Sequence, residues 1–120
     1  MAERERLICA ASELSEQGRG VRFTLERHGQ LQQAFVVRFE GRPRAFLNQC
    51  GHVPVELDWE EGEFFDDSRL YLICSTHGAL YHPADGQCVG GRCAGRGLIP
   101  VPVFERDGQV YLLESMEEQQ

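Results

Sequence analysis

The stretch "CSTHGALYHPADG" at residues 74–86 decides how the rest of the sequence is interpreted. It places Cys74 and His77 three residues apart, and a glycine follows at once. Upstream, "NQCGHV" at residues 48–53 places Cys50 and His52 two residues apart. The two pairs together supply two sulfur and two nitrogen ligands, the usual number for one metal centre. The sequence therefore predicts a metal site that two separate segments of the chain build together.

The order of the ligands bears on which metal is bound. Zinc is the simplest occupant, because two Cys and two His suit tetrahedral zinc. Zinc fingers with this ligand set usually have both cysteines in one arm and both histidines in the other, whereas here each arm supplies one of each. A binuclear iron cluster explains the mixture, since each arm can give its Cys to one iron and its His to the other. A zinc-binding interaction domain stays open as an alternative.

Three segments resemble the Rieske 2Fe-2S family, over roughly residues 7–114, and most closely its soluble ferredoxins and nitrite reductase small subunits. They are "VVRFEGRPRAFLNQC" at 36–50, "CSTHGALYHPADG" at 74–86 and "VGGRCAGRGLIPVPVFERDGQVYL" at 89–112. The resemblance implies one Rieske-type 2Fe-2S cluster per chain, with Cys50 and Cys74 on one iron and His52 and His77 on the other. The chain departs from the family at Gly51, Ser75 and Arg92, where proline is frequent; these departures concern the loops and leave all four ligands in place.

Short runs rich in Val, Phe, Ile, Leu and Tyr predict an all-β fold. Turn signals separate them at "EGRP" (40–43), "ADG" (84–86) and "DG" (107–108). The segment "ASELSEQG" (11–18) predicts one helical turn capped by Ser12. The resemblance implies the Rieske-type fold of small antiparallel sheets, in a single domain over residues 1–120 with a cluster-binding subdomain at about 47–96. The expected strands are "RLICA", "VRFTLE", "AFVVRFE", "PRAFLN", "LYLI", "LIPVPVF" and "VYLLE".

Composition excludes several classes of function. The net charge of −7 and the lack of any clustered arginines argue against a nucleic-acid partner. The apolar runs fall far short of the roughly 20 residues that a membrane helix needs, so we expect no membrane association. Five cysteines without an export signal argue against a disulfide framework and favour a cytoplasmic protein. Cys88 and Cys93 are interpreted as small packing residues rather than as ligands or a redox pair.

The resemblance implies a function in electron transfer. We expect a soluble, non-catalytic protein that carries one electron on its cluster between a reductase and a terminal oxidoreductase. A small Rieske subunit of a nitrite-reductase-type or other oxidoreductase complex, and a redox-sensing module, are the alternatives. Seven acids lie between the two pairs, in the acidic loop of residues 56–67 that runs from Glu56 to Asp67. This loop is either solvated surface or a docking site for a basic redox partner.

The sequence also predicts a potential at the low end of the family's range. High-potential Rieske proteins carry an additional Cys in each ligand loop and a Ser that donates a hydrogen bond to the cluster. The corresponding positions here are Val55, Thr76 and Ala79. With fewer hydrogen-bond donors, the negative charge added on reduction is less stabilised, which lowers the reduction potential. Tyr81 lies where its hydroxyl can reach a cysteine sulfur, or where its ring packs under the loop.

Overall fold

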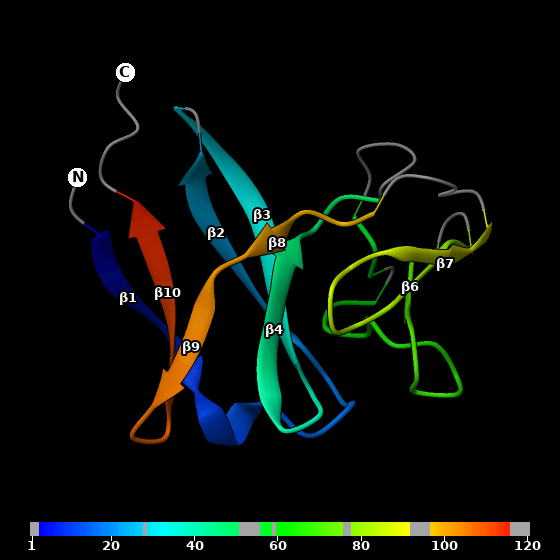
Figure 1. The fold of residues 1–120 in the computed structure, drawn as a ribbon, viewed down its shortest axis with the longest axis horizontal. Coiled ribbons are helices and arrows are strands. Elements are labelled where there is room, and N and C mark those ends of the chain that lie inside the picture. Colours follow the sequence, from blue (N-terminus) through cyan, green and yellow to red (C-terminus); the bar gives the residue numbers. More distant parts are fainter. Residues whose placement is uncertain are drawn as a thin grey trace.

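The protein is described by a computed structural model that covers residues 3–27, 29–50, 56–58, 60–75, 78–91 and 97–115. Within these residues ten strands form three antiparallel sheets, which confirms the all-β prediction (Figure 1). The first sheet has the order β1-β10-β9, the second β2-β3-β4-β8 and the third β5-β6-β7. The strands are β1 (Glu3–Ala10), β2 (Val21–Arg27), β3 (Gln30–Phe39), β4 (Arg42–Leu47), β5 (Leu72–Ile73), β6 (Leu80–Tyr81), β7 (Cys88–Gly90), β8 (Pro100–Val101), β9 (Val103–Arg106) and β10 (Gln109–Ser115).

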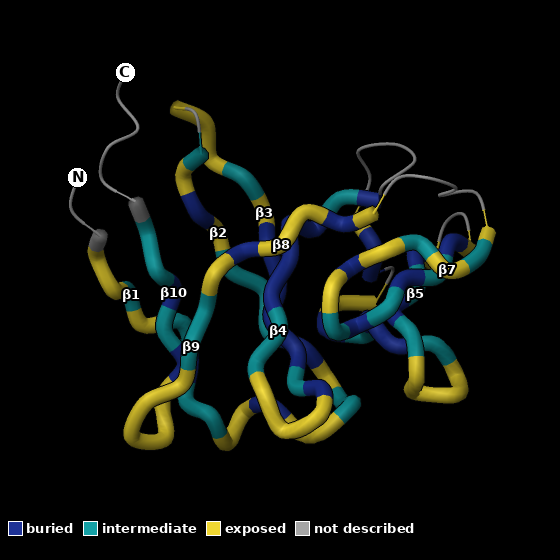
Figure 2. Tube along the Cα trace, in the orientation of Figure 1, coloured by how far each residue is buried: buried dark blue, intermediate teal, exposed yellow. Residues whose placement is uncertain are grey.

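The second sheet is the middle layer of the fold, because the inner parts of β3 and β4 are buried on both faces (Figure 2). Successive side chains of a strand point to opposite faces. Along β3, Phe35 and Val37 pack in one hydrophobic cluster with residues of the third sheet. The alternate residues Ala34 and Val36 pack in another cluster with residues of the first sheet. A register slip of one residue would exchange the two sets, so these four side chains fix the position of both outer layers.

Two hairpins of the first two sheets close where the sequence predicts turns. β3 and β4 are joined by Glu40 and Gly41, with φ of 56° and 75°. β9 and β10 are joined by Asp107 and Gly108, with φ of 53° and 77°. Positive φ at both central residues is the geometry that suits the twist of a two-residue hairpin. These turns place β4 and β10 in register with their neighbours.

Some boundaries differ from the sequence-based expectation. The helical turn is a 3-10 turn over Ala11–Glu13 that begins after Ala10, so the prediction of Ser12 as its cap was wrong. The carboxylate of Glu13 instead accepts a hydrogen bond from the Ala10 N–H at 3.2 Å. The run "LIPVPVF" is not one strand but two, β8 and β9, separated at Pro102. Proline cannot donate a ladder hydrogen bond, and here the chain leaves the second sheet to join the first.

The third sheet is inserted between β4 and β8 and lies beside the other two, at the right of Figure 1. β5 pairs with β6 through Leu72 and Tyr81, and β6 pairs with β7 through Tyr81 and Cys88. Its strands have two or three residues each, so side-chain packing against the second sheet contributes more to its stability than its ladder. The described part of the chain contains no helix of the length and apolarity that crossing a membrane would require.

Candidate metal centre

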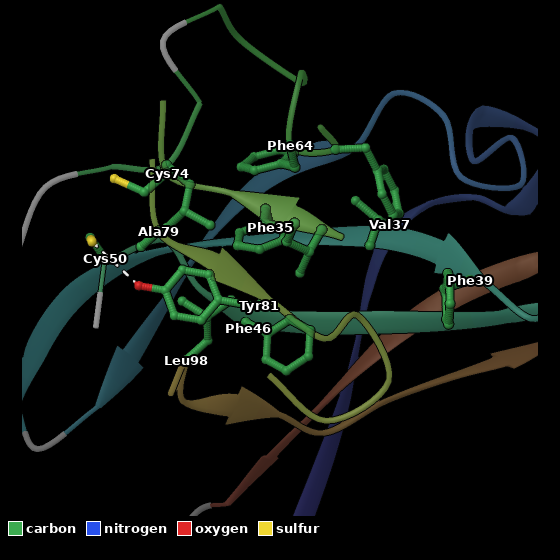
Figure 3. Packing of buried hydrophobic residues seen from close by; sticks show 13 residues of the cluster. Phe35, Val37, Phe39, Phe46, Cys50, Phe64, Cys74, Ala79, Tyr81 and Leu98 are labelled. Atoms are coloured by element: carbon green, nitrogen blue, oxygen red, sulfur yellow. Dashed lines mark hydrogen bonds between the residues drawn. The ribbon is translucent and has the colours of Figure 1, made fainter. Parts of the chain in front are cut away.

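The two predicted cysteine ligands lie at the ends of strands from different sheets. Cys50 follows β4 and is 4% exposed, and Cys74 follows β5 directly and is fully buried. Both side chains are thiols rather than halves of a disulfide, and both belong to the hydrophobic cluster between the second and third sheets. Figure 3 shows their sulfur atoms pointing to the same side, away from the aromatic rings of Phe35 and Phe64. Two strand ends thus present two sulfur donors to one region.

The second ligand segment is a tight loop that closes the β5–β6 hairpin. The Cys74 N–H donates to the carbonyl of Ala79 at 2.9 Å, and the Gly78 N–H donates to the carbonyl of Cys74 at 2.7 Å. Ala79 is fully buried. The backbone of this loop is therefore held at both ends, next to the Cys74 sulfur.

A glycine of the next segment fits against the same loop. Gly91 follows β7 and has a φ of +85°. A Cβ atom placed on it would lie 2.8 Å from Ala79 Cα and 2.9 Å from the carbonyl oxygen of Gly78. The close approach requires glycine at this position, because real Cβ atoms do not come so near to a backbone.

Tyr81 contributes a polar atom to the buried site. Its ring is fully buried, and its hydroxyl oxygen lies 3.3 Å from the Cys50 sulfur, as the dashed line in Figure 3 marks. The structure supports both interpretations from the sequence, because the ring packs under the loop and the hydroxyl reaches a cysteine. A thiolate that binds a metal has no proton to donate, so in that state the tyrosine O–H must be the donor.

The two ligand segments are linked to each other through Leu57. Its carbonyl accepts a hydrogen bond from the Ser75 N–H at 3.0 Å, and its N–H donates to the Asn48 Oδ1 atom at 2.8 Å. Ser75 is adjacent to Cys74, and Asn48 is two residues before Cys50. Sequence reasoning did not single out Asn48 or Leu57.

Several predicted site residues lie outside the described residues. They are the ligands His52 and His77, together with Val55, Thr76 and Arg92. Among the residues that the structure does describe, no group of three or more His, Cys, Asp and Glu side chains is arranged to hold a metal ion. The described donors do fit a Rieske-type cluster, because two buried thiols on linked loops are the sulfur half of its ligand set.

The acidic loop does not present all of its carboxylates to solvent. Asp58 is only 3% exposed and forms an ion pair with Arg22, with 2.8 Å between Oδ2 and Nε. Burial acts to raise the pKa of Asp58, but hydrogen bonds from Arg22, Asn48 and the Gly62 N–H lower it below its usual value. The hydrogen bond between Arg22 and Asp58 also raises the pKa of Arg22. The expectation that the whole loop forms one solvent-facing surface is therefore wrong for Asp58.

Other carboxylates of this loop are also used within the fold. Glu63 pairs with Arg19 at 2.8 Å, and Asp66 accepts a hydrogen bond from the Ser68 hydroxyl at 2.8 Å. Glu60, Glu61 and Asp67 are exposed and enter none of the ion pairs found among the described residues. The negative charge that the loop presents to solvent is carried by these three side chains and by Glu56. Glu56 is also exposed, and its Oε1 atom lies 3.4 Å from a guanidinium nitrogen of Arg22.

The remaining described cysteines lie outside the site. Cys9 is a buried free thiol in β1, and burial and the nearby Glu13, opposed by Arg38, raise its pKa to about 11. Cys88, in β7, packs against the hydrophobic cluster that contains Cys50 and Cys74, as the sequence predicts, but it is also disulfide-bonded, so its interpretation as a packing residue alone was wrong. Cys93 lies outside the described residues.

Comparisons with known proteins agree with this geometry. The model of the Rieske [2Fe-2S] domain matches residues 5–115. No curated protein matches the chain. Among solved structures, the chain is similar to the ferredoxin of carbazole 1,9a-dioxygenase from Nocardioides aromaticivorans IC177, with 16% identity, a TM-score of 0.69 and coverage of 92% of this chain and 98% of that one.

Two further structures share the fold. The ferredoxin of Sphingomonas yanoikuyae B1 is 19% identical, with a TM-score of 0.70 and coverage of 93% of this chain and 99% of that one. The terminal oxygenase of carbazole 1,9a-dioxygenase from N. aromaticivorans IC177 is 21% identical, with a TM-score of 0.70. Its match covers 98% of this chain but 32% of the oxygenase, so the present chain corresponds to about a third of that protein.

Proposed function

Because the chain belongs to the Rieske [2Fe-2S] domain family, we propose that it is a non-catalytic carrier of one electron. The 2Fe-2S cluster of this family takes up and releases one electron, and two Cys and two His hold it. Here Cys50 and Cys74 hold one iron, and His52 and His77 hold the other. The observation that carries the proposal is the pair of buried thiols on two linked loops, Cys50 and Cys74.

The iron content of the purified protein tests this assignment. We expect a coloured protein with two irons and two acid-labile sulfides per chain, as one 2Fe-2S cluster requires. Replacing His52 or His77 by Ala or Cys should abolish the Rieske-type spectrum, whereas His82→Ala, outside the ligand set, should leave it unchanged. A colourless protein with stoichiometric zinc, from cells supplied with iron, would contradict the proposal and favour the zinc-binding alternative.

The described residues around Cys74 support a low potential within the family range of about −150 to +300 mV. Ala79 is fully buried in the ligand loop and has no hydroxyl to donate, and the Tyr81 hydroxyl lies 3.3 Å from the Cys50 sulfur. The two neutral histidine ligands raise the reduction potential of a Rieske cluster above that of all-cysteine clusters, and each hydrogen bond donated to a sulfur raises it further. A measured midpoint above about +100 mV would contradict this part of the proposal.

The partners are redox proteins. Structural neighbours include complexes between the oxygenase and the ferredoxin of carbazole 1,9a-dioxygenase. By analogy of fold, we place this chain between a reductase and a terminal oxidoreductase, in the cytoplasm. Residues 56–91 contain eight Asp and Glu but only one Arg, so the segment that carries Cys74 is strongly acidic. Such a patch steers a basic partner toward the site.

Charge neutralisation tests the docking surface. Basic cytochrome c serves as the electron acceptor, and its reduction by the reduced protein is followed by stopped flow at increasing salt. Replacing Glu60 and Glu61 by Gln should slow reduction at low salt and flatten the salt dependence, because electrostatic steering acts mainly on the association rate. Asp107→Asn, in the exposed β9–β10 turn, is the matched control and should have little effect. If wild-type rates hardly change with ionic strength, the acidic loop is solvated surface and not a docking site.

The association state separates a free carrier from a subunit. A stable monomer with fast electron exchange is expected for a carrier. Co-purification with a larger oxidoreductase would instead favour a small subunit of the nitrite-reductase type.

A further inference from the structure

The side chain of Asn48 closes the first ligand segment on itself. Its amide nitrogen donates to Asp58 Oδ1 at 3.1 Å, and its amide oxygen accepts from the Leu57 N–H at 2.8 Å. These partners lie ten and nine residues further along the chain, and Cys50 and His52 lie between. Asn48 is 2% exposed, so both hydrogen bonds are shielded from water. One amide group therefore fixes both ends of the loop that carries two of the four proposed ligands.

The backbone of Leu57 extends this connection to the second ligand segment. Its N–H is held by Asn48, and its carbonyl accepts from the N–H of Ser75, the residue after Cys74. The Leu57 side chain is fully buried in the cluster that contains both cysteines. A displacement of Asn48 would thus be passed through one residue, Leu57, to the segment that carries Cys74.

Asp58 and Arg22 hold the Asn48 amide in one orientation. The Asp58 carboxylate accepts from Arg22 Nε at 2.8 Å and NH2 at 3.0 Å, and from the Gly62 N–H at 3.0 Å. Arg22 belongs to β2 of the second sheet, which anchors the arrangement to the middle layer. With a carboxylate on one side and a backbone N–H on the other, the amide nitrogen can face only Asp58.

We propose that Asn48, held by Asp58 and Arg22, is a positioning residue that sets the placement of the two ligand segments relative to each other. The inference rests on the proposed function, because it concerns how firmly the cluster is held. Asn48 does not touch the metal. Groups that hydrogen-bond directly to metal ligands typically contribute about 10- to 100-fold to metal affinity, because they pre-orient the ligands before the metal is bound. Asn48 acts on residues beside the ligands, through Leu57 and Asp58, so we take the lower end of that range.

The test compares Asn48→Ala with a variant of similar stability loss elsewhere. Val110→Ala is the control, since Val110 is fully buried in the cluster between the first and second sheets, remote from the ligand loops. Both proteins are isolated with their cluster, and the loss of visible absorbance in excess chelator is followed. We expect Asn48→Ala to lose its cluster about 10-fold faster than wild type or more, and its electron paramagnetic resonance spectrum to shift. Val110→Ala should melt at a lower temperature than wild type yet keep the wild-type spectrum.

A second test exchanges the amide of Asn48 and the carboxylate of Asp58, so that the inference can still be tested if Asn48→Ala fails to fold. Asn48→Asp keeps the acceptor for Leu57 but places a second carboxylate against Asp58, so cluster loss should accelerate. Adding Asp58→Asn restores one amide and one carboxylate in that pair, and should recover a substantial part of the lost cluster retention. If Asn48 contributed only to the stability of the fold, the spectrum of Asn48→Asp would not change, and the double variant would have no spectral change to recover.

Two outcomes would overturn the inference. The first is an Asn48→Ala protein whose spectrum and rate of cluster loss match those of Val110→Ala. The second is a double variant that retains its cluster no better than Asn48→Asp alone. Failure of the proposed function is distinguishable, because the wild-type protein would then contain no iron and no labile sulfide.

Discussion

Removing the hydroxyl of Tyr81 tests the electrostatic environment of Cys50 directly. The hydroxyl oxygen and the Cys50 sulfur are 3.3 Å apart, and both residues are buried. Reduction of the site adds one negative charge. A hydrogen bond to a charged acceptor strengthens as negative charge grows on that acceptor, so Tyr81 stabilises the reduced state more than the oxidised state.

The magnitude follows from the free energy of such hydrogen bonds. A hydrogen bond to a charged group contributes about 1.5–3 kcal/mol. Only the part that changes with oxidation state affects the potential, and we take this part as about 1 kcal/mol. For transfer of one electron, a tenfold change in the equilibrium constant is about 59 mV and about 1.4 kcal/mol. Tyr81→Phe should therefore lower the midpoint potential by about 40 mV.

Protein-film voltammetry at neutral pH measures this shift. Tyr111→Phe is the matched control, because its hydroxyl donates to Gln109 Oε1 at 2.8 Å on β10, in the first sheet. The control should leave the potential unchanged. A Tyr81→Phe potential within about 10 mV of wild type, or above it, would refute the assignment of this hydroxyl as a donor to the Cys50 sulfur.

Four further predictions follow from single residues. Ala79→Ser adds a hydroxyl at a buried position of the ligand loop and should raise the midpoint by a few tens of millivolts in a redox titration; a lower potential would contradict this. Gly91→Ala places a Cβ 2.8 Å from Ala79 Cα at positive φ and should lower the melting temperature by several degrees, as calorimetry would show. Cys9, with its pKa raised to about 11, should resist iodoacetamide at pH 8 until the protein is unfolded, which mass spectrometry can follow. Wild type should have a larger free energy of unfolding than Asp58→Asn, and this difference should be complete above about pH 5. It should shrink as the pH falls through the lowered pKa of Asp58, because protonation of the carboxylate removes its ion pair with Arg22. Urea unfolding at a series of pH values measures the difference, and a difference that does not change with pH would contradict the prediction.

Local chemistry explains which parts of the fold the sequence predicts well. Gly41 and the pair Asp107–Gly108 mark their hairpins because glycine and, less readily, aspartate tolerate the required positive φ. The run "AFVV" in β3 identifies a strand but not its neighbours, since a strand buried on both faces shows no alternation. Its assignment to two separate clusters depends on contacts with β10 and with the third sheet, which are distant in sequence.

The third sheet shows where sequence patterns stop being informative. β6 and β7 have only two and three residues, too few to display a period of two, and neither was expected as a strand. They form because Tyr81 is buried against Phe46 and Leu98 in the shared core. The ligand spacing, by contrast, is a local property, so the cysteine positions could be read directly from the sequence.

The role of Asp58 could not be read from composition. In a run of seven acids, all carboxylates look equally solvated, and only tertiary structure shows that one is turned inward. A weak signal is present, because Asp58 is flanked by Leu57 and Trp59, whereas four of the five acids that follow occur as adjacent pairs. Its partner Arg22 lies 36 residues earlier on another strand, a separation that no local pattern can bridge.

The inward and outward carboxylates of this loop act on different properties of the protein. Asp58 is shielded and paired with Arg22, so its charge is largely offset where it lies. Glu60 and Glu61 face solvent, where screening reduces interactions beyond about 8–10 Å. Two exposed charges at that distance interact by well under 1 kcal/mol in water, less than the hydroxyl of Tyr81 at 3.3 Å from a buried sulfur. Donors to the sulfur should therefore set the potential, while the exposed acids mainly govern the rate at which a basic partner arrives, so the two properties can be changed independently by mutation.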